Sequence, residues 1–108
     1  LLNNNFQGMV KQWQDMFYKE RYSATKMNNP DFVKLAQAMH WNASKVTTSK
    51  DLPQKMKEFL ETDGPCLLEA VTTADEHTYP MVPTGQGLHE MILSPTDKHP
   101  AINGLAPS

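Results

Sequence analysis

Residues 66–71, Cys-Leu-Leu-Glu-Ala-Val, are the stretch that decides the fold. The stretch is apolar at almost every position, which is typical of a strand covered by helices on both faces, as in parallel sheets. It follows Gly64 and Pro65, which can end a helix because glycine takes the left-handed cap and proline blocks continuation. The sequence therefore predicts a buried strand that comes directly after a helix.

Three segments that precede this strand carry apolar residues at helical spacing. They predict helices at about 8–19, at about 30–40, and from Ser49 or Asp51 to about Asp63. The second helix has the clearest start, because Asn29 can cap it and Pro30 suits the first helical position. Asp31 adds a negative charge that complements the helix dipole.

Two further strands are expected, at Leu1-Leu2 and at Lys45-Val46-Thr47-Thr48. The order strand, helix, helix, strand, helix, strand indicates an α/β fold with a parallel sheet flanked by helices. The periodicity then ends, and residues 80–90 form a loop rich in proline and glycine that leads into a short helix at about 87–92. Residues 94–108 contain three prolines and no periodicity, so we expect an extended or disordered tail.

Composition excludes several classes of protein. A chain of 108 residues has room for one domain at most, and a hydrophobic content of 39% with a charged content of 20% is ordinary for a globular protein. A net charge of −2 provides no basic surface for phosphates, so nucleic-acid binding is not expected. No apolar run approaches the roughly 20 residues that cross a bilayer. The single cysteine, Cys66, excludes an internal disulfide and is expected to be an inert core thiol.

The segment with the clearest chemical meaning is Leu2-Asn3-Asn4-Asn5-Phe6-Gln7-Gly8-Met9-Val10. It predicts a strand end, an amide-rich turn and the start of a helix. Ligands of open α/β sheets bind at the carboxyl ends of strands, and a helix N-terminus favours a diphosphate. Amide and carbonyl oxygens suit a hard cation such as Mg²⁺. Spacing alone favours a simpler interpretation, an Asn-rich turn that caps a helix.

Other residues that could carry chemistry give weaker signals. Four histidines lack i, i+4 pairing and a neighbouring cysteine, so no zinc site is expected: His40, His77, His89 and His99. Met9 and Trp13 are four residues apart, and this spacing by itself favours packing of a buried helix face. Thr84 and Gly85 are also compatible with a plain Pro-Thr-Gly turn. Glu69 is expected to be a carboxylate at the end of the strand.

The run Asn3-Asn4-x-x-Gln7-Gly8-Met9-Val10-x-Gln12-Trp13 resembles the start of the final segment of the catalytic subunit of acetohydroxyacid synthase (acetolactate synthase), a thiamine-diphosphate-dependent family, and the fungal type in particular. Further matches follow in the same order: Phe17-Tyr18, Arg21-Tyr22-Ser23, Asn29-Pro30-Asp31-Phe32, Lys34-Leu35-Ala36, Lys57-Glu58-Phe59, Gly64-Pro65, Leu67-Leu68-Glu69 and Pro80-Met81-Val82-Pro83. The resemblance implies that residues 1–93 are the C-terminal part of a thiamine-diphosphate-binding domain, followed by the tail 94–108.

The resemblance also implies a metal and cofactor site. Asn4 matches the asparagine that binds the Mg²⁺ bridging the cofactor diphosphate. Phe6 stands where the family uses a backbone carbonyl as a further ligand, although many members have an acidic residue there. Gln7, Gly8 and Met9 match positions that line the cofactor. The aspartate ligand belongs to the Gly-Asp-Gly half of the thiamine motif, which this sequence lacks.

The substrate-binding residues implied by the resemblance are Met9, Trp13, Thr84 and Gly85. Trp13 matches the tryptophan that favours 2-ketobutyrate as second 2-ketoacid, and Thr84-Gly85 falls in the loop that covers the active-site entrance. No catalytic residue is expected in this chain, because the glutamate that activates thiamine comes from another domain of a second catalytic subunit. FAD, a family cofactor, binds mainly outside this chain.

The length raises two alternatives for the function. Leu1-Leu2 followed directly by asparagines resembles a buried strand cut open, which favours a fragment of the synthase that needs the remainder of the catalytic chain. The rival is a truncated homologue without catalysis that acts by association with a full-length synthase. A reading frame that continues upstream and carries Gly-Asp-Gly would favour the fragment. The fungal resemblance implies a mitochondrial location.

Overall fold

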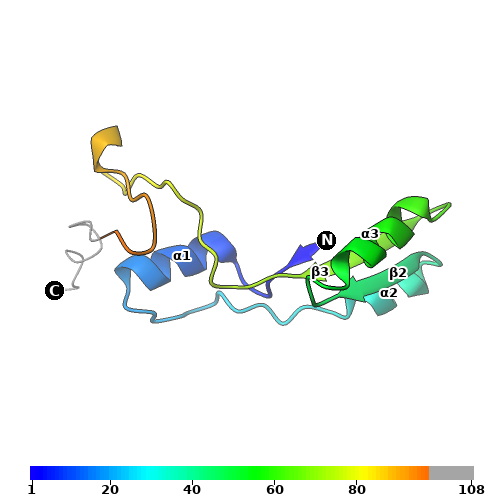
Figure 1. The fold of residues 1–108 in the computed structure, drawn as a ribbon. Coiled ribbons are helices and arrows are strands. Elements are labelled where there is room, and N and C mark those ends of the chain that lie inside the picture. Colours follow the sequence, from blue (N-terminus) through cyan, green and yellow to red (C-terminus); the bar gives the residue numbers. More distant parts are fainter. Residues whose placement is uncertain (98–108) are drawn as a thin grey trace. The chain divides into compact units, whose positions relative to one another are not determined.

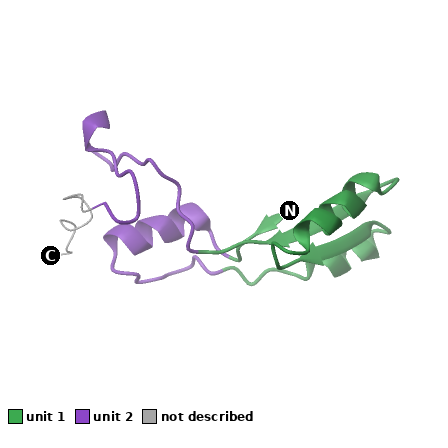
Figure 2. Ribbon diagram, viewed as in Figure 1, with its two compact units in different colours: residues 1–5, 27–74 green, residues 6–26, 75–108 purple. Residues whose placement is uncertain are grey.

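The computed structural model describes residues 1–97, which form two compact units (Figure 2). Unit 1 contains residues 1–5 and 27–74, and unit 2 contains residues 6–26 and, within the described part, residues 75–97. The chain thus enters unit 1, leaves it after the Asn-rich turn, returns at Met27 and leaves again after Ala74. Each unit is described by itself.

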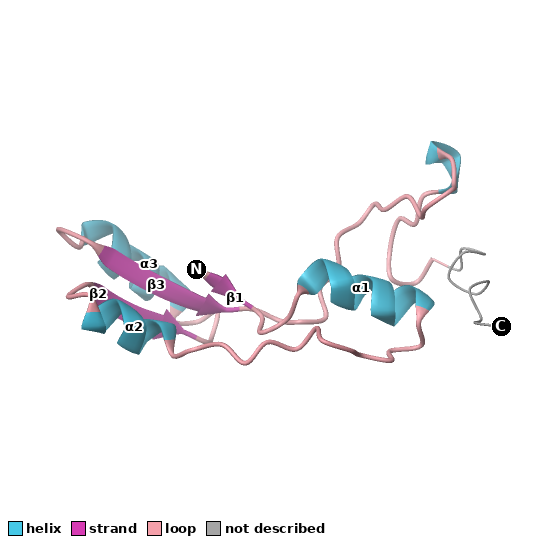
Figure 3. Ribbon diagram, turned by 180° about the vertical axis from the view of Figure 1, so that it is seen from behind, coloured by secondary structure: helices cyan, strands magenta, loops and turns pink. Residues whose placement is uncertain are grey.

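Unit 1 is a three-stranded parallel sheet with the order β1-β3-β2 (Figure 1). Its strands and helices are β1 (Leu2–Asn3), α2 (Phe32–Ala38), β2 (Asn42–Val46), α3 (Leu52–Glu61) and β3 (Cys66–Val71). The chain crosses from β1 past the central position to β2 and then steps back to β3. Because parallel crossovers are right-handed, this reversal places α2 and α3 on opposite faces of the sheet (Figure 3). The predicted parallel α/β layer is confirmed.

The central strand β3 lies where the sequence predicts it, whereas β2 begins earlier than expected. The prediction for β2 was Lys45–Thr48, but the strand pairs with β3 from Asn42 opposite Cys66 to Val46 opposite Ala70. Thr48 belongs to the following turn, because its hydroxyl donates to Asp51 Oδ2 at 2.7 Å and accepts from the Asp51 backbone N–H at 3.3 Å. Local hydrogen bonding of a threonine hydroxyl thus ends the strand.

The helix boundaries of unit 1 follow from their caps. Asp31, rather than Asn29, caps α2, since its carboxylate accepts a hydrogen bond from the Lys34 backbone N–H at 3.1 Å. Helix α3 begins after Asp51 with a proline in its first turn and ends before Gly64, whose φ of +88° is the left-handed conformation expected there.

Unit 2 is built on helix α1 (Gly8–Phe17). A small apolar core forms where Met16 and Phe17 contact Ile92, with three partly buried side chains packed against it: Trp13, Tyr79 and Met81. The backbones of Met81 and Ile92 exchange two hydrogen bonds of 2.9 and 2.7 Å, which join the ends of the intervening loop.

Two expected boundaries in unit 2 are corrected. Helix α1 ends at Phe17 instead of residue 19, because Lys19 and Glu20 adopt left-handed φ values of 54° and 56°. The helix expected at about 87–92 is a single 3-10 turn, η1 (Leu88–Glu90). Residues 94–97 of the expected tail form a turn closed by a hydrogen bond from the Asp97 N–H to the Ser94 carbonyl, and residues 98–108 lie outside the described part. Within residues 1–97, no helix has the length and apolarity to cross a membrane.

Candidate functional site

The Asn-rich turn follows β1 at the carboxyl end of its sheet in unit 1. Asn3 is buried, Asn4 is half-buried and Asn5 is exposed. The Asn3 side-chain oxygen accepts a hydrogen bond from the Asn5 backbone N–H at 3.0 Å, and Asn5 has a left-handed φ of 58°. Asparagine tolerates this conformation better than most residues. The turn thus places Asn4 between two residues whose positions are fixed by hydrogen bonds.

The residues after the turn belong to unit 2 and form the start of α1. The Gln7 backbone N–H donates to the Thr25 carbonyl at 2.9 Å, and its carbonyl accepts from the Lys11 N–H at 2.9 Å. The Gln7 side chain does not cap the helix, and no acidic residue lies in the first turn. No carboxylate in the first turn therefore offsets the positive end of the α1 helix dipole. This favours an anion near the start of the helix.

Met9 and Trp13 lie on α1 but in different surroundings. Met9 is 77% exposed, so the helix-face packing that its spacing suggested does not include it. Trp13 is partly buried, and its ring lies 4.9 Å from that of Phe17. Trp13 also lines a pocket of about 320 Å³ with Val10, Gln14, Tyr18 and Arg21. The Trp13 side chain therefore packs against the core and also forms an apolar wall of this pocket.

Thr84 and Gly85 form an exposed turn. The Gln86 N–H donates to the Pro83 carbonyl at 3.1 Å, and Gly85 has a φ of +81°, a conformation that favours glycine. This geometry is that of the plain turn allowed by the sequence, and it leaves both residues available for contacts.

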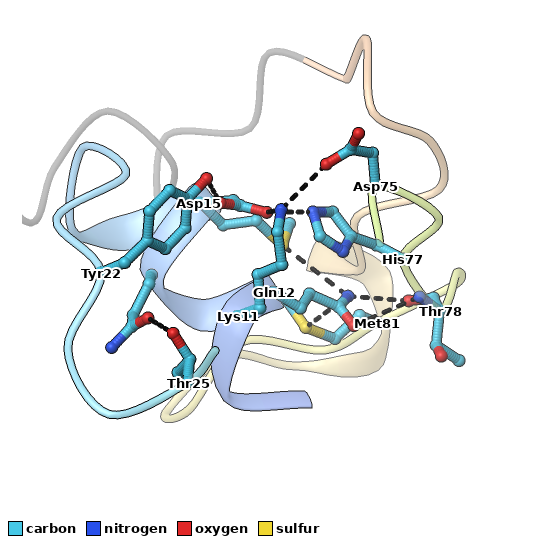
Figure 4. Close-up of polar contacts among 11 residues, drawn as sticks. Lys11, Gln12, Asp15, Tyr22, Thr25, Asp75, His77, Thr78 and Met81 are labelled. Atoms are coloured by element: carbon cyan, nitrogen blue, oxygen red, sulfur yellow. Dashed lines mark hydrogen bonds and ion pairs between the residues drawn. The ribbon is translucent and has the colours of Figure 1, made fainter. Parts of the chain in front are cut away.

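A polar network that the sequence did not indicate fixes residues 75–81 to α1 (Figure 4). Lys11, whose side chain is 6% exposed, forms ion pairs with Asp15 at 2.7 Å and Asp75 at 3.1 Å. His77 Nε2 lies 2.7 Å from Asp15 Oδ2, and Asp15 Oδ1 accepts a hydrogen bond from the Tyr22 hydroxyl. The i, i+4 spacing of Lys11 and Asp15 was a local signal, but His77 is distant in sequence and was considered only as a zinc ligand, which its spacing did not favour.

Gln12 extends this network by pairing with the backbone of Thr78. Its Nε2 donates to the Thr78 carbonyl at 2.9 Å, and its Oε1 accepts from the Thr78 N–H at 3.2 Å. The Gln12 side-chain amide therefore bonds to both the carbonyl and the N–H of Thr78, as the backbone of a neighbouring strand would. Together with the ion pairs it fixes the segment that leads into the loop carrying Thr84 and Gly85.

The electrostatics of the network favour its charged form. Burial alone would raise the pKa of Asp15, but hydrogen bonds from Lys11 and Tyr22 outweigh it and hold that pKa below its ordinary value. Burial would likewise lower the pKa of Lys11, yet its hydrogen bonds to Asp15 and Asp75 raise it. The ion pair is therefore intact at neutral pH.

Replacing Asp15 by asparagine should destabilise the chain at neutral pH by about 1–3 kcal/mol, because a charged hydrogen bond is lost and Lys11 loses its nearest carboxylate. A depressed carboxyl pKa contributes stability above the unfolded value near 4, and that contribution disappears as pH falls through the lower folded value. The melting-temperature difference between Asp15→Asn and the original chain should therefore shrink from pH 7 to pH 3. A constant difference, or an equal loss in Glu61→Gln, whose residue is exposed, would contradict this role of the pair.

The metal site that the resemblance implies uses two neutral oxygens of the described residues. These are the Asn4 side-chain oxygen and the Phe6 carbonyl; among residues 1–97 no group of three or more His, Cys, Asp or Glu side chains could hold a metal. Both oxygens are of the type that Mg²⁺ accepts, but Mg²⁺ requires about six oxygen ligands. Two such oxygens therefore fit only part of the ligand set that Mg²⁺ requires.

A parallel sheet with helices on both faces and an amide-rich turn at a strand end is typical of α/β proteins that bind ligands at the carboxyl ends of their strands. The chain belongs to the family described as thiamine pyrophosphate enzyme, C-terminal TPP binding domain, which matches residues 1–70.

Individual relatives agree with this family. The mitochondrial acetolactate synthase of Schizosaccharomyces pombe is 55% identical over 93 residues, which cover 86% of this chain and 14% of the relative. The mitochondrial catalytic subunit of acetolactate synthase from Saccharomyces cerevisiae is 49% identical over 92 residues, covering 85% and 13%. The chloroplastic acetolactate synthase 1 of Zea mays is 39% identical over 101 residues, covering 86% and 16%. The chain thus spans about one seventh of the length of these relatives.

Proposed function

We propose that this chain is the C-terminal part of the cofactor-binding domain in the catalytic subunit of an acetolactate synthase. The observation that carries the proposal is the 55% identity over 93 residues, a stretch long enough to include both units. The whole enzyme joins a two-carbon unit from pyruvate to a second 2-ketoacid. The fungal relatives are named mitochondrial, which supports a mitochondrial location for this protein.

Asn4 and Phe6 are proposed to hold Mg²⁺ at the cofactor diphosphate, Asn4 through its side-chain oxygen and Phe6 through its backbone carbonyl. A backbone ligand explains why phenylalanine can stand where relatives often have an acidic residue. Gln7, Gly8 and Met9 follow at the start of α1, where backbone N–H groups and the helix dipole favour the diphosphate. Two neutral oxygens do not neutralise Mg²⁺, so the remaining ligands are expected from the cofactor diphosphate and from the rest of the synthase.

Thiamine diphosphate, when bound, would supply the stabilisation of a carbanion. The residues of this chain are proposed to bind and orient the cofactor and to select the second 2-ketoacid. The exposed Met9 and the pocket-lining Trp13 are proposed to form the wall that contacts the second 2-ketoacid. Thr84 and Gly85 are proposed to contact substrate from the loop that the network of Lys11, Asp15 and His77 ties to α1. FAD and the glutamate that activates thiamine are expected outside this chain, the latter in a second catalytic subunit.

A segment exchange in cells tests the proposal. Residues 1–93 of this chain replace the aligned segment of the Schizosaccharomyces pombe synthase, to which the chain is similar over 93 residues, in a strain without its own enzyme. Growth without added valine, leucine and isoleucine is the expected result. A stable, correctly located chimera that does not support growth would favour the rival, a homologue without catalysis that acts by association.

A further inference from the structure

Glu69 is a carboxylate in a place that normally excludes charge. It was expected at the strand end, but it lies within β3 and is only 1% exposed. Burying a charge is unfavourable unless partners compensate for the lost water. Asn3 Nδ2 donates a hydrogen bond of 2.7 Å to Glu69 Oε1. The Lys45 ammonium lies 3.1 Å from Oε2 as an ion pair, outside the alignment of a hydrogen bond.

The Asn3 amide links this carboxylate to the Asn-rich turn. While Nδ2 donates to Glu69, Oδ1 accepts from the Asn5 backbone N–H at 3.0 Å and from Asn29 Nδ2 at 3.0 Å. A flipped amide would place its NH₂ group against two donors and its oxygen against a carboxylate. Glu69 therefore determines which way the Asn3 amide faces, and so where its acceptor lies.

That acceptor holds the far end of the turn in an unfavourable backbone conformation. Asn5, at φ 58°, is also fixed by a hydrogen bond of 2.8 Å from the Met27 N–H to its carbonyl and one of 3.2 Å from Asn29 Nδ2 to its side chain. Asn4 lies between Asn3 and Asn5 in the sequence. Its backbone position is thus determined by contacts that begin at Glu69.

We propose that Glu69 is a positioning residue that, through the Asn3 amide, fixes the turn presenting Asn4 to the Mg²⁺–diphosphate. The proposal rests on the assignment of Asn4 as a metal ligand. An apolar side chain at position 69 would suit a buried parallel strand, but it would leave Asn3 Nδ2 buried without an acceptor and free the amide to turn. A charged acceptor held by Lys45 prevents this.

The test uses the intact synthase that carries this chain and measures thiamine diphosphate binding to the cofactor-free enzyme by calorimetry at increasing Mg²⁺. Glu69→Leu should raise the half-saturating Mg²⁺ concentration about ten-fold or more, because partners behind a metal ligand typically have effects of this size. Glu69→Gln retains an acceptor for Asn3 and should raise the half-saturating Mg²⁺ concentration less than about three-fold. Asn29→Ala is the variant to use if Glu69→Leu does not fold, because it removes one donor to Asn3 and no buried charge. It should raise the half-saturating Mg²⁺ concentration about three-fold.

Each outcome decides between the roles. A folded Glu69→Leu enzyme with the original Mg²⁺ dependence, while Asn4→Ala has lost it, would overturn the positioning role alone. An original Mg²⁺ dependence in Asn4→Ala would overturn the metal assignment and the positioning role together. Equal losses in Glu69→Leu and Glu69→Gln that follow a fall in melting temperature would show a structural role only. If Glu69→Leu does not fold, an unchanged Asn29→Ala enzyme would overturn the proposal.

Discussion

Replacing Asn4 by alanine in the intact synthase is expected to weaken Mg²⁺-dependent thiamine diphosphate binding by at least about 100-fold. Loss of a partner behind a metal ligand reaches that size, and loss of the ligand itself should not be smaller. Asn4 follows directly after β1, at the edge of the sheet where open α/β proteins bind ligands. The measurement is a calorimetric titration of the cofactor-free enzyme with thiamine diphosphate at fixed Mg²⁺.

The matched control is Asn28→Ala, an exposed asparagine of unit 1 outside the turn. It should bind the cofactor as the original enzyme does. Both variants should keep the original melting temperature in the cofactor-free state, because Asn4 is only half-buried. A folded Asn4→Ala enzyme with unchanged affinity would return the turn to the simpler interpretation of a helix-capping loop.

Replacing Trp13 by leucine should reduce the preference for 2-ketobutyrate over pyruvate as second substrate about ten-fold or more. The two substrates differ by one methylene, and such a contact in an apolar pocket contributes roughly 1–3 kcal/mol. The ring of Trp13 is anchored on one side by Phe17 and lines the pocket on α1. The ratio of acetohydroxybutyrate to acetolactate, formed from a fixed mixture of both substrates, measures the effect.

Trp41→Leu is the control, since Trp41 is partly exposed and lies in unit 1. Its product ratio should not change. Trp13 also packs against the core of Met16, Phe17 and Ile92, so Trp13→Leu is expected to lower the melting temperature as well. An unchanged product ratio together with that lower melting temperature would leave Trp13 with core packing as its role.

The sequence predicted the parts of the fold that depend on local signals. The strand Cys66–Val71 has the predicted bounds, because Gly64 and Pro65 end the preceding helix and continuous apolarity marks a central parallel strand. The start of β2 was missed, since Asn42 and Ala43 lack strand character of their own. They become part of the sheet by pairing with Cys66 and Leu67, which a sequence pattern does not show.

The resemblance supplied the candidate site residues, whereas contacts between side chains distant in the sequence gave no signal in it. Asn4 and Trp13 belong to a recognisable run, and their roles are proposed from that resemblance. His77 approaches Asp15 from 62 positions further along the chain, and Asn3 reaches Glu69 across 66 positions. Such contacts depend on how the chain returns after β3, which the spacing of residues within a single segment does not encode.

Acetolactate formation from pyruvate, measured side by side for two purified proteins, tests the central claim most directly. One protein is the 108-residue chain, and the other is the Schizosaccharomyces pombe synthase with residues 1–93 of this chain in place of its own segment. With thiamine diphosphate, Mg²⁺ and FAD present, the chimera should form acetolactate and the isolated chain should form none, because the two oxygens proposed as ligands, of Asn4 and Phe6, are only part of the ligand set that Mg²⁺ requires. A folded chimera that forms no acetolactate, or turnover by the isolated chain that Asn4→Ala abolishes, would contradict the account.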